Sequence, residues 1–270
     1  MQYFEKSGEK MPLLGYGTFR ASGSDCIKGV EMAIETGYRH IDTARAYGNE
    51  AEVGKGIKNS GIDRDQLFIT SKIGASELKP KQIIKETESS LKNLQTEYLN
   101  LMLIHWPSEE IPLEKSLEAL FELQDEGKIK AVGVSNFTTD LVEDAASVGE
   151  IFTNQVEYHP LLDQQKLLAV TRKHDILLTA YSPIAKGEVN EQQILQEIGE
   201  KYGKLPTQVT LRWLIQQDRV AAIPKSVTEK HIRSNFDIFD FELTEEEMEK
   251  IYTLQGDHRL VDPAWAPQWD

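Results

Sequence analysis

Residues 99–107, LNLMLIHWP, consist of a short, mostly apolar run that ends at a polar residue, His105. The run 99–104 has the length and composition of a strand that is buried on both faces, as in a parallel sheet. The same pattern recurs along the chain. We predict further strands at 38–41, 67–71, 131–134, 151–155, 177–181 and 220–223, with an earlier one near 14–18.

Amphipathic helical patterns separate these strands. One begins after Pro80, another runs through 117–123 before Gly127, and Thr244 with Glu247 predicts a helix start near the C-terminus. Residues 2–13 predict a small hairpin closed by Ser7-Gly8. Eight strands separated by helices favour an α/β fold. We expect a single (β/α)8 barrel over residues 1–270, with an N-terminal β-hairpin and extra helices near the C-terminus. An open, doubly wound sheet is the alternative, and strand number does not separate the two.

Composition excludes several classes of protein. The chain has 270 residues and a formal net charge of −14, which argues against nucleic acid or an anionic membrane as the main partner. A single cysteine, Cys26, excludes an internal disulfide and a cysteine-rich zinc site. Four of the first ten residues are charged, and no apolar run is long enough to span a membrane, so we expect a cytoplasmic protein.

Polar residues follow the predicted strands at regular intervals. Asp42, Lys72 and His105 come at the ends of three successive strands, and Tyr47 follows Asp42 by five residues. In a parallel barrel these strand ends meet at one mouth, where active sites are built. Any one of these residues alone is better explained as a solvated or structural group. Their combination predicts an active site.

These four side chains suit the reduction of a carbonyl group. A free tyrosine has a pKa near 10, so we expect the Lys72 cation to make Tyr47 a better acid. Asp42 would hold Lys72 charged, and His105 would orient the substrate carbonyl. No side chain donates hydride, so this chemistry requires a reduced nicotinamide or flavin.

The common nucleotide and metal motifs are absent. The pattern Gly15-x-Gly17 has Arg20 where a dinucleotide fingerprint needs glycine or alanine, and the P-loop-like stretch 48–56 has the wrong spacing. No HExxH or paired-histidine motif occurs, so we expect no metal site.

A different nicotinamide site is available at the later strand ends. Ser135, Asn136 and Gln155 could bond a carboxamide, and Tyr181 could offer its ring face to a nicotinamide. The stretch 223–228 precedes a predicted helix, so its backbone N–H groups and Lys225 could bind a phosphate.

The longer motifs of the chain resemble those of the aldo-keto reductases, and they run nearly end to end. The matching segments are 15–18 (GYGT), 37–44 (GYRHIDTA), 47–50 (YGNE), Lys72, 103–107 (LIHWP), 133–137 (GVSNF), 154–160 (NQVEYHP) and 223–226 (IPKS). The tail, with 259–261 (RLV), 266–267 (AP) and 269–270 (WD), is similar to that of the bacterial 2,5-diketo-D-gluconate reductase branch, type B.

The resemblance implies a (β/α)8 barrel that binds NADPH across its mouth and reduces small aldehydes, ketones and dicarbonyls. 2,5-Diketo-D-gluconate and methylglyoxal are among the candidate substrates. It implies that Tyr47 donates the proton and that Asp42, Lys72 and His105 complete a catalytic tetrad. The implied cofactor-binding residues are Gly17, Thr18, Ser135, Asn136, Gln155, Tyr181, Ser182, Pro183, Lys225, Ser226, Val227, Thr228, His231 and Asn235. The substrate positions expected from their place in the chain are Tyr16, Phe19, Trp106 and Trp265.

Three departures from the family pattern affect these expectations. His231 stands where many relatives carry an arginine near the 2′-phosphate, so some NADH use is expected. Gly74 replaces a common tryptophan, and the segment after Leu254 is short, which together predict an open pocket.

By analogy with relatives we expect a monomer. The alternative functions are a non-catalytic nicotinamide-nucleotide-binding barrel and a flavin-dependent barrel.

Overall fold

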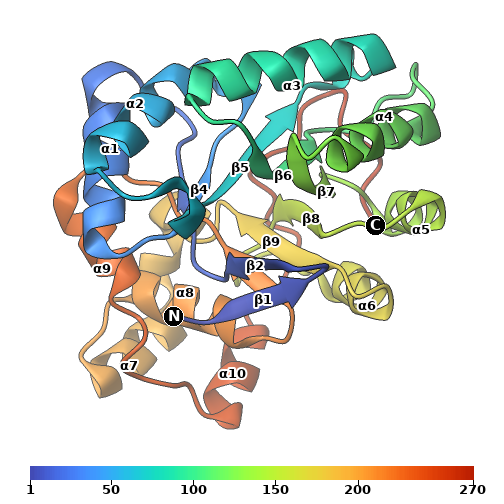
Figure 1. Cartoon of the computed structure of the whole chain (residues 1–270). Coiled ribbons are helices and arrows are strands. Elements are labelled where there is room, and N and C mark those ends of the chain that lie inside the picture. Colours follow the sequence, from blue (N-terminus) through green and yellow to red (C-terminus); the bar gives the residue numbers. More distant parts are fainter.

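The computed structural model describes all residues from 1 to 270 and contains one sheet of eight parallel strands. The strands follow one another around this sheet in chain order, from β3 to β10 (Figure 1). They are β3 (Tyr16–Gly17), β4 (His40–Asp42), β5 (Phe68–Ile73), β6 (Leu99–Ile104), β7 (Ile129–Ser135), β8 (Thr153–Glu157), β9 (Leu177–Tyr181) and β10 (Val220–Ala222). All eight predicted strands are therefore confirmed.

The first and last strands meet and close the sheet into a barrel. Parallel bridges join Leu14 to Ala222 and Gly17 to Lys225. The Gly15 amide donates to the Ala222 carbonyl at 2.9 Å. This closure distinguishes the barrel from the open doubly wound sheet.

Helices cover the outside of the barrel (Figure 1). They are α1 (Gly23–Thr36), α2 (Glu50–Ser60), α3 (Pro80–Leu94), α4 (Leu113–Asp125), α5 (Thr139–Val148), α6 (Gln165–Lys173), α7 (Gln193–Tyr202), α8 (Pro206–Gln216), α9 (Glu229–Phe236) and α10 (Glu245–Tyr252), with short 3-10 turns η1 (Arg45–Tyr47), η2 (Arg64–Gln66), η3 (Ala75–Glu77) and η4 (Ala185–Glu191). Two helices, α7 and α8, follow β9, and α10 comes after the last βα unit, so the expected extra C-terminal helices are present. None of these helices is long and apolar enough to cross a membrane.

The predicted hairpin closes one end of the barrel. Its strands β1 (Tyr3–Lys6) and β2 (Glu9–Pro12) pair antiparallel. Met11 belongs to a small apolar cluster with Phe68 and Phe152, and Phe4 of the hairpin packs edge-on against Phe152. The opposite end, at the carboxyl ends of the strands, is therefore the end available for a site.

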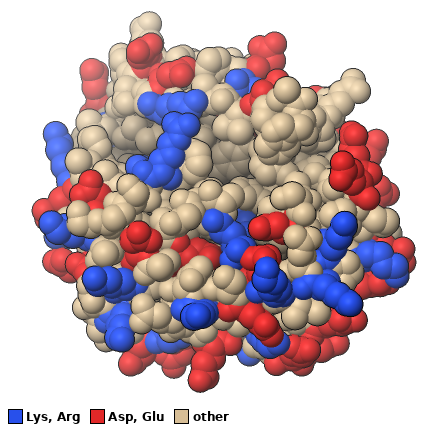
Figure 2. All heavy atoms as spheres, turned by 90° about the horizontal axis from the view of Figure 1, so that it is seen from above, with Lys and Arg blue, Asp and Glu red and all other residues tan.

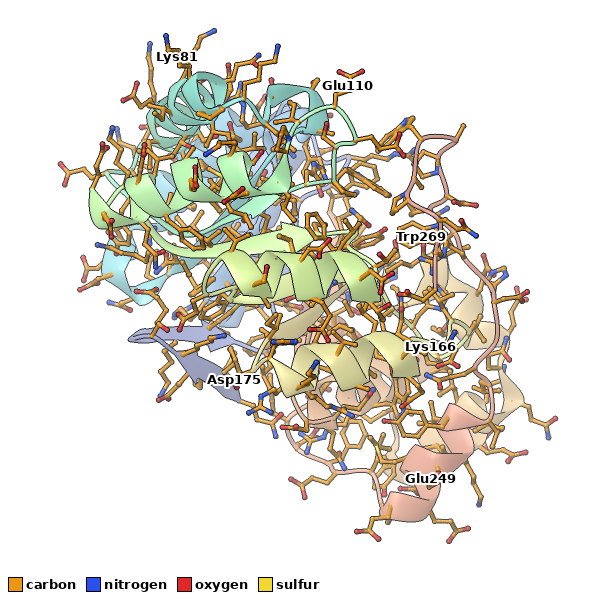
Figure 3. The ribbon with its side chains drawn as sticks, turned by 90° about the vertical axis from the view of Figure 1, so that its right-hand side faces the viewer. Lys81, Glu110, Lys166, Asp175, Glu249 and Trp269 are labelled. Carbon is orange, nitrogen blue, oxygen red and sulfur yellow. The ribbon has the colours of Figure 1, made fainter.

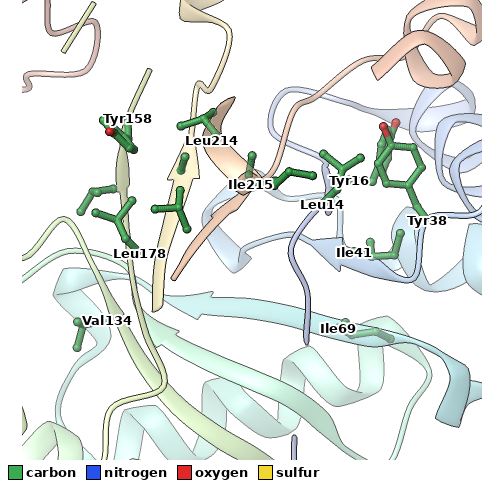
Figure 4. Close-up of a cluster of buried hydrophobic side chains, with 14 of the residues drawn as sticks. Leu14, Tyr16, Tyr38, Ile41, Ile69, Val134, Tyr158, Leu178, Leu214 and Ile215 are labelled. Atoms are coloured by element: carbon green, nitrogen blue, oxygen red, sulfur yellow. The ribbon is translucent and has the colours of Figure 1, made fainter. Parts of the chain in front are cut away.

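Successive side chains along each strand point alternately into the barrel interior and toward the outer helix layer. Ile41 lies in the large apolar cluster between strands and helices, beside Tyr16 and Tyr38 (Figure 4). Its neighbours His40 and Asp42 are buried on the other side of the strand, where they contact groups of the barrel interior.

Charge is distributed over the surface without one dominant patch in the view of Figure 2. Acidic and basic side chains are interspersed there, and the hollowed centre of this face is lined mostly by other residues.

Candidate active site

The four predicted catalytic residues come together at the mouth of the barrel. Lys72, in β5, places its Nζ 2.5 Å from Asp42 Oδ1 at the end of β4 and 3.3 Å from the Tyr47 hydroxyl on η1. Lys72 also donates to the Thr43 carbonyl at 2.8 Å. The ring of His105, directly after β6, meets the Tyr47 ring edge-on with centroids 5.8 Å apart.

A small polar network holds the loop that carries Tyr47. Gly48 ends η1 with φ at 64°, in the left-handed region that favours glycine. The Thr43 hydroxyl donates to Asn49, whose amide group donates to the carbonyls of Thr18 and Ala21 at 2.9 Å each. The loop after β4 is thereby tied to the loop after β3.

The electrostatics of the site keep the phenol protonated. Burial, followed by the nearby Asp42 carboxylate, raises the pKa of Tyr47 well above its usual value. Burial and Asp42 set this direction, and the expectation that the Lys72 cation makes Tyr47 a better acid stays a prediction. Burial also lowers the pKa of Lys72, which Asp42 opposes.

His105 is neutral at any ordinary pH. Burial and then the Lys72 charge lower the pKa of its imidazole to about 3. A neutral imidazole retains one N–H, so His105 can donate a hydrogen bond to a substrate carbonyl.

Three of the residues predicted to bind the nicotinamide, Ser135, Asn136 and Tyr181, form a connected group of polar side chains. The Asn136 amide group donates to the Ser135 hydroxyl at 3.0 Å and to the His105 carbonyl at 2.9 Å, and its Oδ1 accepts from the Tyr181 hydroxyl at 2.8 Å. Asn136 adopts a positive φ of 62°, and so does Ser182 after β9 at 47°. These residues follow β7 and β9, the two neighbours of β8, and such backbone strain is typical of a functional site.

Gln155 links this group to the tetrad. Its Nε2 donates to Asp42 Oδ2 at 2.7 Å, a contact that the sequence did not predict. Amide and hydroxyl groups beside an aromatic ring fit the carboxamide and the flat ring of a nicotinamide, so the donor set suits this cofactor.

The predicted phosphate-binding stretch 223–228 directly precedes α9, and three of its six residues, Lys225, Val227 and Thr228, are exposed. Ser226 and Thr228 share a hydroxyl contact of 3.0 Å, and Thr228 Oγ1 lies 3.1 Å from His231 Nδ1. Lys225 and Val227, which precede α9, are exposed, whereas Asn235 on α9 is buried. A helix N-terminus with hydroxyls and a free lysine fits a phosphate group.

The remaining predicted cofactor positions, Gly17, Thr18 and Pro183, are buried. A Cβ at Gly17 would lie 2.9 Å from the Ile223 carbonyl, so close strand approach accounts for this glycine. The Thr18 hydroxyl donates to the Asp42 carbonyl at 3.0 Å.

The four substrate positions divide into two groups. Phe19 is 52 % exposed and its ring centroid lies 5.0 Å from that of Tyr47, while Trp106 and Trp265 contact each other at 4.8 Å. Tyr16 is 1 % exposed and its hydroxyl donates to the Ser226 carbonyl. The prediction that Tyr16 lines the pocket is wrong, because its ring faces the outer helix layer.

Sequence reasoning also missed a buried carboxylate. Glu157, the last residue of β8, is fully buried and accepts hydrogen bonds from the backbone amides of Leu260 and Val261. An acidic residue at the end of an apolar strand was a visible signal, but its partners lie about a hundred residues further along the chain.

Known proteins share this chain's sequence and fold. The Aldo/keto reductase family pattern matches residues 13–255. Glyoxal reductase of Bacillus subtilis (strain 168) is 43 % identical over 94 % of this chain and 92 % of that protein. Methylglyoxal reductase DkgA of Escherichia coli (strain K12) is 40 % identical over 94 % of each chain. A crystal structure described as "a putative 2,5-diketo-D-gluconic acid reductase B" superposes with a TM-score of 0.95 at 43 % identity, covering 98 % of this chain and 95 % of that one.

Proposed function

The chain belongs to the aldo/keto reductase family of oxidoreductases, and we propose that it reduces small aldehydes, ketones and dicarbonyls with NADPH, using Tyr47 as the proton donor. The names of its relatives, glyoxal reductase and methylglyoxal reductase, support dicarbonyl substrates. Methylglyoxal and 2,5-diketo-D-gluconate are the first two compounds to assay.

The single observation that carries this proposal is the fully buried Lys72, which joins Asp42 to Tyr47. A buried ammonium costs much free energy unless it is paired. Here its donors are directed to a carboxylate, a backbone carbonyl and the phenol oxygen. This arrangement fixes the phenol in place next to a positive charge.

Residues at the later strand ends would hold the cofactor. Ser135, Asn136 and Gln155 would bond the carboxamide, and Tyr181 would pack against the ring. Lys225 and the first turn of α9 would bind the phosphate. A reduced nicotinamide supplies the hydride that adds to the carbonyl carbon.

The protein's own groups act on the carbonyl oxygen. His105 donates a hydrogen bond that directs this oxygen toward Tyr47. As negative charge grows on the oxygen, Tyr47 transfers its proton, and the Lys72 ammonium stabilises the charge left on the phenol. An alkoxide is a stronger base than a phenolate, so the raised pKa of Tyr47 does not prevent this transfer.

Replacement of Tyr47 tests the proposal directly. Tyr47→Phe removes only the phenolic oxygen, so kcat for methylglyoxal should fall by about 10²–10⁴-fold, the usual contribution of a positioned acid. NADPH binding, followed by fluorescence titration, should stay within about twofold of the wild type because the binding residues remain.

Tyr3→Phe is the matched control, because Tyr3 is exposed on the hairpin, away from the mouth. Retained turnover in Tyr47→Phe would contradict the proton-donor role.

If the wild type binds NADPH but reduces no carbonyl in a broad panel, the chain is a non-catalytic nucleotide-binding barrel. A yellow purified protein would indicate a flavin.

A further inference from the structure

Glu157 is a fully buried carboxylate that the proposed chemistry does not use. Oε1 accepts from the Leu260 amide at 2.7 Å and lies 3.0 Å from His159 Nε2, and Oε2 accepts from the Val261 amide at 2.8 Å. A carboxylate buried away from water is stable only when donors surround it. All the donors recorded for Glu157 come from His159 and from one short segment near the end of the chain.

His159 completes this site as a donor. The Leu161 amide donates to His159 Nδ1 at 3.3 Å, so this nitrogen accepts and Nε2 carries the proton that is directed at Glu157. Burial alone would raise the pKa of Glu157, but the hydrogen bonds from His159 and from the Leu260 and Val261 amides outweigh it and keep the pKa below its usual value. Glu157 therefore remains an acceptor for both amides.

The segment that Glu157 holds, residues 257–270, is called the tail segment below. Its own contacts keep it compact: the Arg259 guanidinium lies 3.9 Å from the Trp269 ring centroid, and Trp269 Nε1 donates to Asp262 at 2.9 Å. The Asp270 carboxylate accepts from the backbone amide and hydroxyl of Thr139 at the start of α5. Figure 3 shows Trp269 on this segment, which runs along one side of the molecule.

The tail segment places an aromatic ring against Trp106, the residue that follows His105. Trp265 lies between the two attachment points and is 64 % exposed, with its ring centroid 4.8 Å from that of Trp106. Trp106 follows His105 directly in the chain. The position of Trp265 beside the mouth thus depends on contacts made at both ends of the tail segment.

We propose that Glu157 is a positioning residue, which fixes the tail segment through the Leu260 and Val261 amides so that Trp265 forms one wall of the substrate pocket. The inference rests on the proposed function, because it concerns the pocket of that same reaction. The buried pair Glu157–His159 acts on the substrate only through Trp265 and leaves the proton donor untouched.

Limited proteolysis tests whether Glu157 holds the tail segment, and it does so without measuring enzyme activity. Trypsin cleaves after arginine, and the bond after Arg259 is held by the Leu260 amide contact with Glu157. Glu157→Gln places an amide NH₂ among N–H donors, so cleavage at this bond should become about tenfold faster or more, the effect of about one lost hydrogen bond to a charged group. Mass spectrometry would identify the released fragment 260–270.

Glu247→Gln is the matched control. Glu247 is also buried and also accepts a backbone amide, that of Thr244, but it lies on α10 and caps that helix. This variant should lose stability without faster cleavage after Arg259. Equal cleavage rates for the wild type and Glu157→Gln would overturn the anchor.

Kinetics then test the role in substrate binding. Glu157→Gln should raise KM for methylglyoxal by about three- to tenfold, with kcat and the NADPH dissociation constant within about twofold of the wild type. In a Trp265→Ala background the same substitution should change KM little, because the two residues act as one unit. Additive effects on KM, or an unchanged KM, would overturn the positioning role. Inactivity of every variant and of the wild type, with cleavage still accelerated, would refute the proposed function alone.

Discussion

The two ends of β4 and β5 carry opposite kinds of side chain inside the same barrel. At the hairpin end, Phe68 packs against Phe152 and meets the His40 ring edge-on. At the mouth, four residues further along β5, Lys72 meets Asp42. The strand residues His40, Asp42, Phe68 and Lys72 are each at most 3 % exposed, so both ends of the strands are shielded from water.

The two ends differ in the sign of the free energy of burial of their side chains. Apolar contacts at the hairpin end stabilise the barrel directly, because apolar surface leaves water. At the mouth, burial of Asp42 and Lys72 is unfavourable for each alone and is offset only by their mutual contact and by Gln155 and Thr43. The buried Asp42–Lys72 pair at the mouth therefore serves catalysis, and removing either partner should destabilise the fold strongly.

Breaking the Asp42–Lys72 pair at the mouth should have the largest effect on both stability and activity. Lys72→Met leaves Asp42 charged and buried, which should lower the free energy of unfolding by about 3–5 kcal/mol in urea titrations. It should also abolish most carbonyl reduction. The double variant Asp42→Asn/Lys72→Met should regain much of this stability but no activity, because no buried charge is left unpaired.

Phe68→Leu is the matched change at the other end of β5. It should cost about 1–3 kcal/mol and leave kcat nearly unchanged, because Phe68 contributes packing only. A large loss of kcat in Phe68→Leu, or an active Lys72→Met, would contradict the division between the two ends.

Lowering the pH should reduce the free energy of unfolding by a comparable amount through His40 at the hairpin end and His105 at the mouth. Burial lowers the pKa of His40 to about 4 and that of His105 to about 3, whereas an unfolded histidine has a pKa near 6.5. Below pH 6.5 the unfolded chain therefore binds protons that the folded chain does not, and stability falls as pH falls. From pH 7.5 to pH 5 each histidine should cost about 2 kcal/mol.

His40→Gln separates the two contributions, because it removes the titration at the hairpin end only. The loss of stability between pH 7.5 and pH 5, measured by denaturation at each pH, should shrink by about 2 kcal/mol in this variant. An identical pH dependence in His40→Gln and the wild type would show that the pKa of His40 is the same in the folded and unfolded chain.

The smallest effect is expected at the exposed start of α9. His231→Arg adds a guanidinium where we propose that the phosphate binds, so the preference for NADPH over NADH should rise by about two- to fivefold, the size of an exposed ion pair. The ratio of kcat/KM for the two cofactors measures this preference. Gln193→Arg, which adds the same charge on α7, should leave the ratio unchanged; an equal rise in both variants would point to net charge alone.

The repeating strands and their polar ends were predictable from the sequence because they are local patterns. The strand from Leu99 to Ile104 has the predicted bounds, and Asp42, Lys72 and His105 lie at one mouth as expected. Closure of the barrel was not decided locally, since it depends on pairing between Leu14 and Ala222.

The misplacement of Tyr16 has a physical cause that was visible in part in the sequence. A Cβ at Gly15 would lie 2.4 Å from the His40 ring, so the glycines of the first strand face the interior and Tyr16 faces outward. Counting alternate residues could have placed Tyr16 correctly. The rise in the pKa of Tyr47 depends on how the folded barrel surrounds its hydroxyl, which the sequence alone does not determine. The attachment of the tail segment to Glu157 was likewise unpredictable, because it joins distant parts of the chain.

The meeting of β3 with β10 also bears on how the protein is made. A ribosome adds about 5–20 residues each second, so roughly 8–30 s separate the synthesis of Lys72 from that of Ala222. Until Ala222 has emerged, the ring of strands has a gap, and water reaches the charges that the finished barrel excludes. We therefore expect Asp42 and Lys72 to become fully buried only when the last fifth of the chain, which contains β10, is translated.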